Sequence, residues 1–397
     1  MKIVWSFSSQ QGDVPVDDEV LKRPFVLRLR PLQLHPVLSL EDFFSAMETA
    51  VLKEGGRQLA LILSRIWKKD VNPGDIERLL FRYEKYGTLY QIVSIEVFSG
   101  TLRVKLSGNV ALLPEARATL QREAALLEQL NRRYGYPYLP RVYMLDSVDI
   151  RRRDFVQRMD VLLSQWFEDF HEWHFCGDKD QADSILIWDL EAGYRRASQG
   201  ERHEIIRAAS RILTLYFDPE TYAQILPWHH GGGDFVVRSE RVGIQVRLVT
   251  ARGYQPLIGS AAKEGLSPPE ALLLFFLDMT VRMRLDKFEG LGEAVWASDG
   301  ILPSVILGFL EGLKQMKGEG RIAGDLVDRV VRMLSSLRKE DLYGRFERLM
   351  EIYRARDPGD FPCIKRNLEG HTRELHRYLE SRVMEWVRRP EFGLNQD

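Results

Sequence analysis

The chain has 397 residues, 45% of them hydrophobic and 28% charged, and its formal net charge at pH 7 is −1. This balance leaves no basic surface for nucleic acid, and no apolar run approaches the about 20 residues that span a membrane, so neither partner is expected. Two cysteines, Cys176 and Cys363, cannot form a disulfide framework and suit a reducing compartment. The N-terminus is too polar for a signal peptide. We therefore expect a cytoplasmic protein with more than one folded core.

The N-terminal part of the chain mixes strand-like and helical patterns. Residues 25–31 alternate like a strand, and Ser39, with an acid three residues later, predicts the start of a helix. The apolar run 59–67 fits a helix or a buried strand, and its periodicity does not separate the two. Asn72, followed by proline, predicts the cap of a further helix over 74–85.

Apolar and polar residues then alternate with a period of two. The alternating runs 90–97 and 101–106, separated by a short Ser-Gly turn, predict an antiparallel hairpin. Residues 114–133 follow as a helix with one apolar stripe. Two further strands are predicted over 138–145 and 159–167.

The second half of the chain is predicted to be mainly helical. Residues 188–226 are expected to be mostly helix and to lead into a Gly-rich loop with two histidines, followed by two short β-like runs. Ser267-Pro-Pro-Glu270 has the form of a capping box and predicts a long apolar helix. Further helices, broken at glycines, continue to residue 388. Chemistry tends to lie on loops held between regular elements, so the Gly-rich loop is the first candidate site.

The order of these elements resembles the protein-kinase-like fold and looks closest to its aminoglycoside phosphotransferase branch. The resemblance covers residues 90–258, with the C-terminal helices as the expected extension. Lys105 stands at the position of the family's strand lysine, and Glu123 at that of its helix glutamate. The resemblance implies that Glu123 orients Lys105, which holds nucleotide phosphates. The alternative is that both are solvated charges on a strand edge and a helix face.

Residues 162–170 resemble the strand and hinge at which an adenine ring meets backbone groups, which implies that Gln165 and Phe167 contact a nucleotide. An ordinary buried strand with aromatic packing is the alternative. The cofactors that the resemblance implies are ATP and Mg²⁺, and the implied partner is a nucleotide or small molecule.

The Gly-rich loop departs from the family's His-Gly-Asp pattern. His230 and Gly231 match it, but Gly232 stands in place of the aspartate, so Asp234 is the substitute candidate for the catalytic base, beside His230. The family's metal-binding asparagine does not follow Asp234, and its metal-binding aspartate is also missing, because the matching region reads Thr-Ala-Arg-Gly and ends in Arg252-Gly253. Magnesium is usually held by one or two carboxylates, so no metal ligand is assigned.

Three interpretations of the loop remain. The first is a degenerate, pseudokinase-type protein that acts as a nucleotide-sensing or interaction module, with a protein partner. The second is an active ATP-dependent small-molecule phosphotransferase with Asp234 as base. In the third the resemblance is false, and the glycines form a tight chain crossing or an anion-binding turn.

A zinc site is a further hypothesis, since His171, His174 and Cys176 are close in sequence. On a helix the two histidines would share a face, but the cysteine would not join them. Packing histidines are the alternative.

The predicted fold class is α+β, as in a two-lobed kinase-like protein. An N-terminal α/β extension is expected over 1–86, either as its own domain or as a cover over the small lobe. The β-rich small lobe is expected over 87–170, and the helical large lobe over 171–397.

Overall fold

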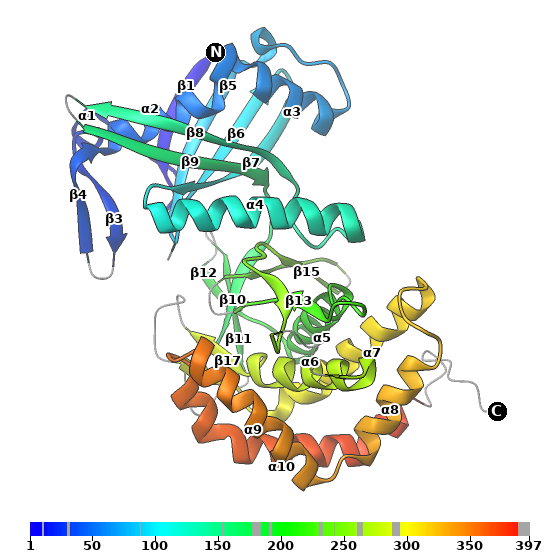
Figure 1. Ribbon diagram of the computed structural model, residues 1–397. Helices are drawn as coiled ribbons and strands as arrows, with labels where there is room; N and C mark the ends of the chain where they lie inside the picture. The colour runs from blue at the N-terminus through cyan, green and yellow to red at the C-terminus, as the bar shows by residue number, and fades with distance from the viewer. Residues whose placement is uncertain are drawn as a thin grey trace. The chain divides into compact units, whose positions relative to one another are not determined.

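The computed structural model describes residues 1–9, 12–29, 32–87, 89–152, 155–176, 184–189, 193–229, 233–241, 243–259, 265–287 and 294–387. The chain divides into two compact units, a β-rich unit and a largely helical unit (Figure 1). The β-rich unit comprises 1–135, 140–168 and 190–193, and the helical unit comprises 136–139, 169–189 and 194–397. The predicted α+β class is confirmed.

The β-rich unit is built on one seven-stranded sheet, with strand order β2-β1-β5-β6-β7-β9-β8, and a separate hairpin, β3–β4. Its strands are β1 (Lys2–Phe7), β2 (Val14–Pro15), β3 (Pro24–Leu29), β4 (Leu32–Ser39), β5 (Arg78–Tyr86), β6 (Gln91–Ser99), β7 (Leu102–Ala111), β8 (Val142–Arg152) and β9 (Phe155–Gln165). Its helices are α1 (Asp18–Leu21), α2 (Leu40–Val51), α3 (Arg57–Trp67) and α4 (Pro114–Tyr134). The predicted order of hairpin, helix and two strands is confirmed as β6, β7, α4, β8 and β9.

One prediction in this unit is wrong. Residues 74–85 are not a helix: a single 3-10 turn at Pro73–Asp75 is followed by β5. The apolar residues of the segment fit both periods, but β5 pairs with β1 on one side and β6 on the other. Leu79, Phe81 and Tyr83 are consequently all buried on one face of the sheet. Pairing with distant strands therefore decided between the two patterns.

Helices α2 and α3 bury that face of the sheet. The capping box predicted at Ser39 is confirmed, since the backbone N–H of Ser39 donates to Asp42 Oδ2 at 2.9 Å and Asp42 N–H donates to Ser39 Oγ. The ambiguous run 59–67 belongs to helix α3, whose buried residues Leu59 and Leu63 are four apart. The core against this face includes Phe43, Phe44, Met47, Leu63, Phe81, Val93, Ile95, Leu106 and Val161.

Helix α4 packs on the opposite face of the sheet, at one end of it. A small core of Ala111 on β7, Leu162 on β9 and Leu120 and Ala124 on α4 joins the two. The strands of the expected small lobe and the strand β1 of the expected extension lie in the same sheet, so a division at residue 86 runs through that sheet. The unit boundary at 168–169 lies next to residue 170, where the small lobe was expected to end.

The helical unit contains short strands and six helices among its described residues. The strands are β10 (His171–Phe175), β11 (Ile185–Asp189), β12 (Gly193–Arg196), β13 (Ala223–Ile225), β14 (Phe235–Ser239), β15 (Ile244–Leu248), β16 (Tyr254–Pro256), β17 (Leu285–Lys287) and β18 (Ala294–Trp296). The helices are α5 (Gln199–Leu215), α6 (Pro268–Arg282), α7 (Leu302–Gly318), α8 (Leu326–Ser336), α9 (Lys339–Arg356) and α10 (Phe361–Val387). The mainly helical character predicted for 188–226 is wrong in part, because only α5 is helical there.

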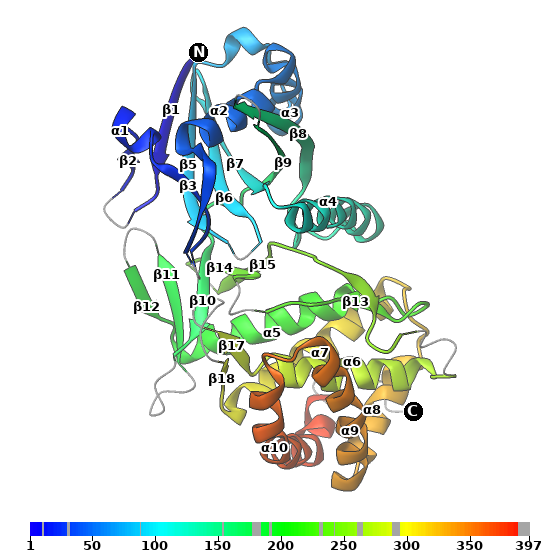
Figure 2. The same cartoon turned by 60° about the vertical axis from the view of Figure 1, so that its left-hand side comes forward.

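Helix α6 lies at the centre of this unit, against α7, α8 and α9 (Figure 2). It is buried almost all round, which explains its apolar sequence. The capping box predicted at its start is confirmed: Ser267 Oγ donates to Glu270 Oε2 at 2.7 Å and Ser267 N–H donates to the same oxygen at 2.9 Å. No helix of the described residues is both long and apolar enough to cross a bilayer.

Buried histidines make the stability of this fold depend on pH. His371 on α10 is fully buried, with Nε2 3.1 Å from Thr280 Oγ1 and Nδ1 3.2 Å from an Arg284 nitrogen. Burial lowers the pKa of His371 well below its usual value, and the charge of Arg284 acts in the same direction. Burial also lowers the pKa values of His35 and His229.

The free energy of unfolding should therefore be highest above about pH 6.5, where histidines of the unfolded chain are neutral. Below that pH it should decrease, because only the unfolded chain then binds protons. Urea unfolding at pH 7.5 and pH 5.5 measures the loss. A His371→Gln variant should lose less stability between these two values than the wild type, whereas His376→Gln, a partly exposed control on the same helix, should leave the difference unchanged. An equal loss in all three proteins would contradict this account.

Candidate functional site

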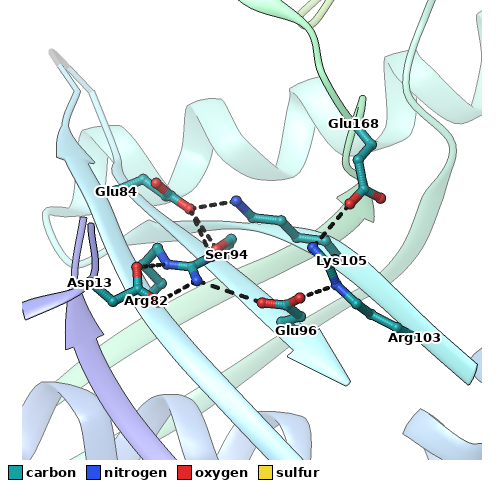
Figure 3. Close-up of polar contacts among 8 residues, drawn as sticks. All are labelled: Asp13, Arg82, Glu84, Ser94, Glu96, Arg103, Lys105 and Glu168. Carbon is teal, nitrogen blue, oxygen red and sulfur yellow. Dashed lines mark hydrogen bonds and ion pairs between the residues drawn. The ribbon is translucent and has the colours of Figure 1, made fainter. Parts of the chain in front are cut away.

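A network of charged side chains covers part of the sheet of the β-rich unit (Figure 3). Lys105 on β7 lies opposite Glu96 on β6, and Arg82 on β5 lies opposite Ser94 on β6. Directly paired residues share a face, so these side chains all project to the side away from the apolar core of α2 and α3. We call this set the sheet-face network: Asp13, Arg82, Glu84, Ser94, Glu96, Arg103, Lys105 and Glu168.

Lys105 is held by two neighbours in this network. Its Nζ lies 2.9 Å from Glu84 Oε1, the oxygen to which Ser94 Oγ donates at 2.6 Å. Its ammonium also lies 4.0 Å from the centre of the Trp166 ring, an attractive cation–π distance. The side chain is only 12% exposed, so both contacts form in a partly desolvated place.

The resemblance implied that Glu123 pairs with Lys105. In the structure the ion-pair partner of Lys105 is Glu84 instead. Glu123 is buried on α4 and accepts a hydrogen bond from the Tyr90 hydroxyl at 2.9 Å. Tyr90 precedes Gln91, which pairs with Val110, five residues from Lys105 along β7. Five residues of strand span about 17 Å, so the Tyr90 contact places Glu123 near the other end of β7.

A buried carboxylate attaches helix α4 to the sheet, near the end of β7 that is far from Lys105. Asp160 on β9 is fully buried and accepts hydrogen bonds from Gln121 Nε2 at 2.6 Å and Ser147 Oγ at 2.8 Å. Buried charges are retained when they are hydrogen-bonded in this way. The helix is thus joined to the sheet without using Lys105.

Glu96 is a buried carboxylate of the sheet-face network. It forms ion pairs with Arg103 and, at 3.6 Å, with Arg82. Arg82 also donates twice to Asp13, which raises the pKa of its guanidinium. Arg103 donates to Glu168 at 3.1 Å.

The sheet-face network has no surplus of positive charge. Its carboxylates outnumber its cations by one. The carboxylates belong to Asp13, Glu84, Glu96 and Glu168, and the cations to Arg82, Arg103 and Lys105. A phosphate that approaches Lys105 would therefore meet a network without net positive charge.

Gln165 and Phe167 lie at the end of β9. Gln165 is the last residue of the strand and pairs with Leu106, next to Lys105, and its N–H donates to the carbonyl of Arg141 at 2.8 Å. Phe167 follows two residues later, beyond Trp166, and is half-buried. The roles of Lys105, Glu123, Gln165 and Phe167 in nucleotide binding stay predictions.

Asp234 belongs to the helical unit, directly before β14. It is 1% exposed, and both its carboxylate oxygens are occupied. Arg252 donates to Oδ1 at 2.6 Å and to Oδ2 at 2.8 Å, and the His229 N–H donates to Oδ2 at 2.7 Å. Val249 N–H donates to the Asp234 carbonyl at 2.8 Å, which fastens the loop to the end of β15.

Arg247 lies on β15, and Arg252 follows it in the region where the resemblance called for a metal-binding aspartate. Arg252 pairs with Asp234 in two parallel hydrogen bonds, the geometry in which a guanidinium holds a carboxylate most firmly. Arg247 lies over the rings of Tyr138 and Phe170, at 5.8 and 5.2 Å, and donates to Gln245. Burial lowers the pKa of Arg247 from its ordinary value.

His230, the other predicted catalytic residue, lies outside the described residues, as do Gly231 and Gly232. Gly233 is described and has a φ of +69°, and a Cβ there would lie 2.7 Å from Glu172 Oε1. The left-handed backbone therefore favours glycine at 233, and a larger residue would also have to shift the Glu172 side chain.

The zinc hypothesis for residues 171–176 is not supported by the geometry. His171 and His174 lie on strand β10, where an interval of three residues puts them on opposite faces. His171 Nε2 is 3.5 Å from Asp189 Oδ2, and His174 Nδ1 is 3.5 Å from Asp286 Oδ1. Both cysteines are free thiols.

A different grouping of possible metal ligands was missed by the sequence analysis. One ligand atom each of His229, Asp357 and Asp360 lies within 4.8 Å of the others. His229 precedes the predicted His230, so the loop signal was one residue away. Asp357 and Asp360 are more than 100 positions further along the chain, and nothing in their local sequence points to them.

No protein-family profile and no curated protein sequence matches the chain. Among solved structures, it is similar to the crystal structure of "Putative fructosamine-3-kinase" from Haemophilus somnus 129PT. The sequence identity is 10%, the match covers 72% of this chain and 96% of that chain, and the TM-score is 0.25. A likeness of this size does not establish what the chain binds or catalyses.

Proposed function

We propose that this chain is a kinase-like protein that does not transfer phosphate and that acts by binding, either of a nucleotide or of a protein partner. The observation that supports it is the state of Asp234, whose two oxygens accept three N–H donors in a buried place. The nearer likeness to the aminoglycoside phosphotransferase branch, and a cytoplasmic location, belong to the same proposal and rest on motif order and cysteine usage.

A catalytic base needs a carboxylate oxygen that can accept a proton from the attacking hydroxyl. Asp234 would have to give up Arg252 first, and breaking a buried ion pair costs about 3 kcal/mol or more. Such a cost lowers the rate by roughly a factor of a hundred. Arg252 itself cannot be deprotonated, so it cannot hold a magnesium ion where the resemblance expected an aspartate.

The sheet-face network supports the same proposal from the other unit. Lys105 is bound by Glu84, and the network carries one negative charge in excess. A phosphate that approaches Lys105 would meet more carboxylates than cations, so we expect ATP to bind weakly.

The second candidate is an active phosphotransferase with an unusual site. It is favoured by Asp357 and Asp360, which supply carboxylates, and by the imidazole of His229, all in the same unit as Asp234. In that case Arg252 would leave Asp234 when substrate binds.

A thermal-shift titration of the full chain with ATP, with and without Mg²⁺, tests the nucleotide part of the proposal. A ligand that binds only the folded state at a hundredfold excess over Kd stabilises it by about 2.7 kcal/mol. We expect a small shift that does not depend on magnesium and is equal in wild type and Lys105→Ala. Lys53→Ala is the matched control, since Lys53 pairs with Asp146 in the same unit but outside the network. A large magnesium-dependent shift that is lost only in Lys105→Ala would support the phosphotransferase instead.

A further inference from the structure

We propose that His229, Asp357 and Asp360 of the helical unit bind a divalent transition-metal ion. The three residues come from the loop after β13, the end of α9 and the start of α10. They offer one imidazole and two carboxylates, a donor set that suits Zn²⁺ or Mn²⁺ better than Mg²⁺ or Ca²⁺, which prefer oxygen ligands alone.

Two polar atoms of this site face each other across an unfilled gap. His229 Nε2 lies 3.8 Å from Asp360 Oδ2, which is too long for a hydrogen bond. Within the described ranges, neither atom has another hydrogen-bond partner. Asp360 is only 4% exposed, so little water reaches it. Buried polar groups that face each other without a bond call for a bridging group.

The distances between these atoms approach those within a single metal site. Zinc lies about 2.0–2.2 Å from nitrogen and oxygen ligands, so two ligands of one ion are separated by up to about 4 Å. The pair of His229 and Asp360 already meets this limit, and all three ligand atoms lie within 4.8 Å of one another. A movement of less than about 1 Å by the Asp357 side chain would complete the set, which leaves a fourth position for water.

Two neighbouring cations hold the carboxylates of this site. Lys287 Nζ lies 2.5 Å from Asp360 Oδ1, and Arg282 donates to Asp357 Oδ2 at 2.7 Å. Each cation thus holds one oxygen of a carboxylate and leaves the other for the ion, as outer partners of metal ligands do.

The surrounding charge permits a cation. Arg282 also pairs with the buried Asp278 at 2.9 Å. The carboxylates of Asp278, Asp357 and Asp360 therefore exceed the cations of Arg282 and Lys287 by one charge. A divalent ion would turn this excess into a single positive charge, which bound hydroxide or another anion could offset.

The test uses the full chain, freed of metal with a chelator and titrated with Zn²⁺, Mn²⁺ or Mg²⁺ by calorimetry. We expect one Zn²⁺ ion per chain, weaker Mn²⁺ binding and no measurable Mg²⁺ binding. His229→Gln and Asp360→Asn should each weaken Zn²⁺ binding at least tenfold. The control His376→Gln should leave it unchanged, although His376 Nδ1 also faces a carboxylate, that of Glu380, at 3.9 Å.

Visible absorption with Co²⁺ as the probe reports the ligands directly and does not depend on activity. The folded wild type should show cobalt bands of nitrogen and oxygen coordination that are lost in His229→Gln. Far-UV circular dichroism confirms that the variant is folded. Absence of Zn²⁺ binding to the wild type, or binding that survives in both variants, would overturn the proposal. No nucleotide is present, so this outcome is separate from that of the phosphate-transfer question.

Discussion

Replacing Arg252 by Ala should lower the free energy of unfolding by about 3 kcal/mol, because it leaves the Asp234 carboxylate charged and buried with one donor in place of three. Chemical denaturation of the purified full chain at pH 7.5 measures this change. Asp234→Asn in the Arg252→Ala background should restore part of the loss, since it removes the uncompensated charge.

Arg338→Ala is the matched control for this experiment. Arg338 also donates twice to a single aspartate, Asp341, but the pair lies on the surface of α9. Exposed ion pairs contribute little, so its denaturation midpoint should stay close to that of the wild type. If the Arg252 and Arg338 variants were equally stable, Asp234 would not be held as described, and the argument against catalysis would lose its support.

Gly308→Ala should destabilise the helical unit by about 3 kcal/mol or prevent its folding. Gly308 lies on α7 where it crosses α5, and a Cβ there would lie 2.1 Å from the Arg207 carbonyl oxygen and 2.8 Å from Ser210 Cβ. The nearest atom is backbone, so the two helices would have to separate, and overpacking of this kind costs about 1–3 kcal/mol or more. Gly312, one turn later, meets Thr214 in the same way.

Gly344→Ala is the control for Gly308→Ala. Gly344 lies in α9 on the exposed side, and a Cβ there would meet nothing within 4 Å. An alanine in an exposed helix interior is favoured over glycine by about 1 kcal/mol, so this variant should be slightly more stable. Thermal unfolding of both variants gives the comparison. A Gly308→Ala protein as stable as the wild type would show that α5 and α7 do not approach as closely as described.

Local patterns predicted much of the fold. The hairpin β6–β7, the helix α4 and the capping boxes at Ser39 and Ser267 depend on neighbours within a few residues, so the sequence contains the whole signal. Strand β5 was missed because its partners β1 and β6 decide its conformation, and one of them is more than 70 residues away. Strands β12 and β13, which lie in the range expected to be mainly helical, were missed for the same reason, since β12 pairs with β11 and β13 with β16.

That error also concealed the sheet-face network. Glu84 was assigned to a helix, so its approach to Lys105 across the sheet could not be foreseen, and Glu123 was the only partner that the motif order offered. The Asp234 loop was singled out because it departs from the family pattern, and its part in function stays a prediction. Its pairing with Arg252 joins residues 18 positions apart through a hairpin, which sequence spacing alone does not reveal.

The most direct test of the account is the release or transfer of the γ-phosphate from ATP by the full chain, with Mg²⁺ or Mn²⁺, followed over many hours. Wild type, Asp234→Asn and Lys105→Ala are compared with a blank that contains no protein. We expect the wild type to be indistinguishable from both variants and from the blank, because Arg252 occupies both oxygens of Asp234 and the carboxylates around Lys105 outnumber the cations. Metal-dependent turnover by the wild type that disappears in both variants would contradict it and would establish a phosphotransferase.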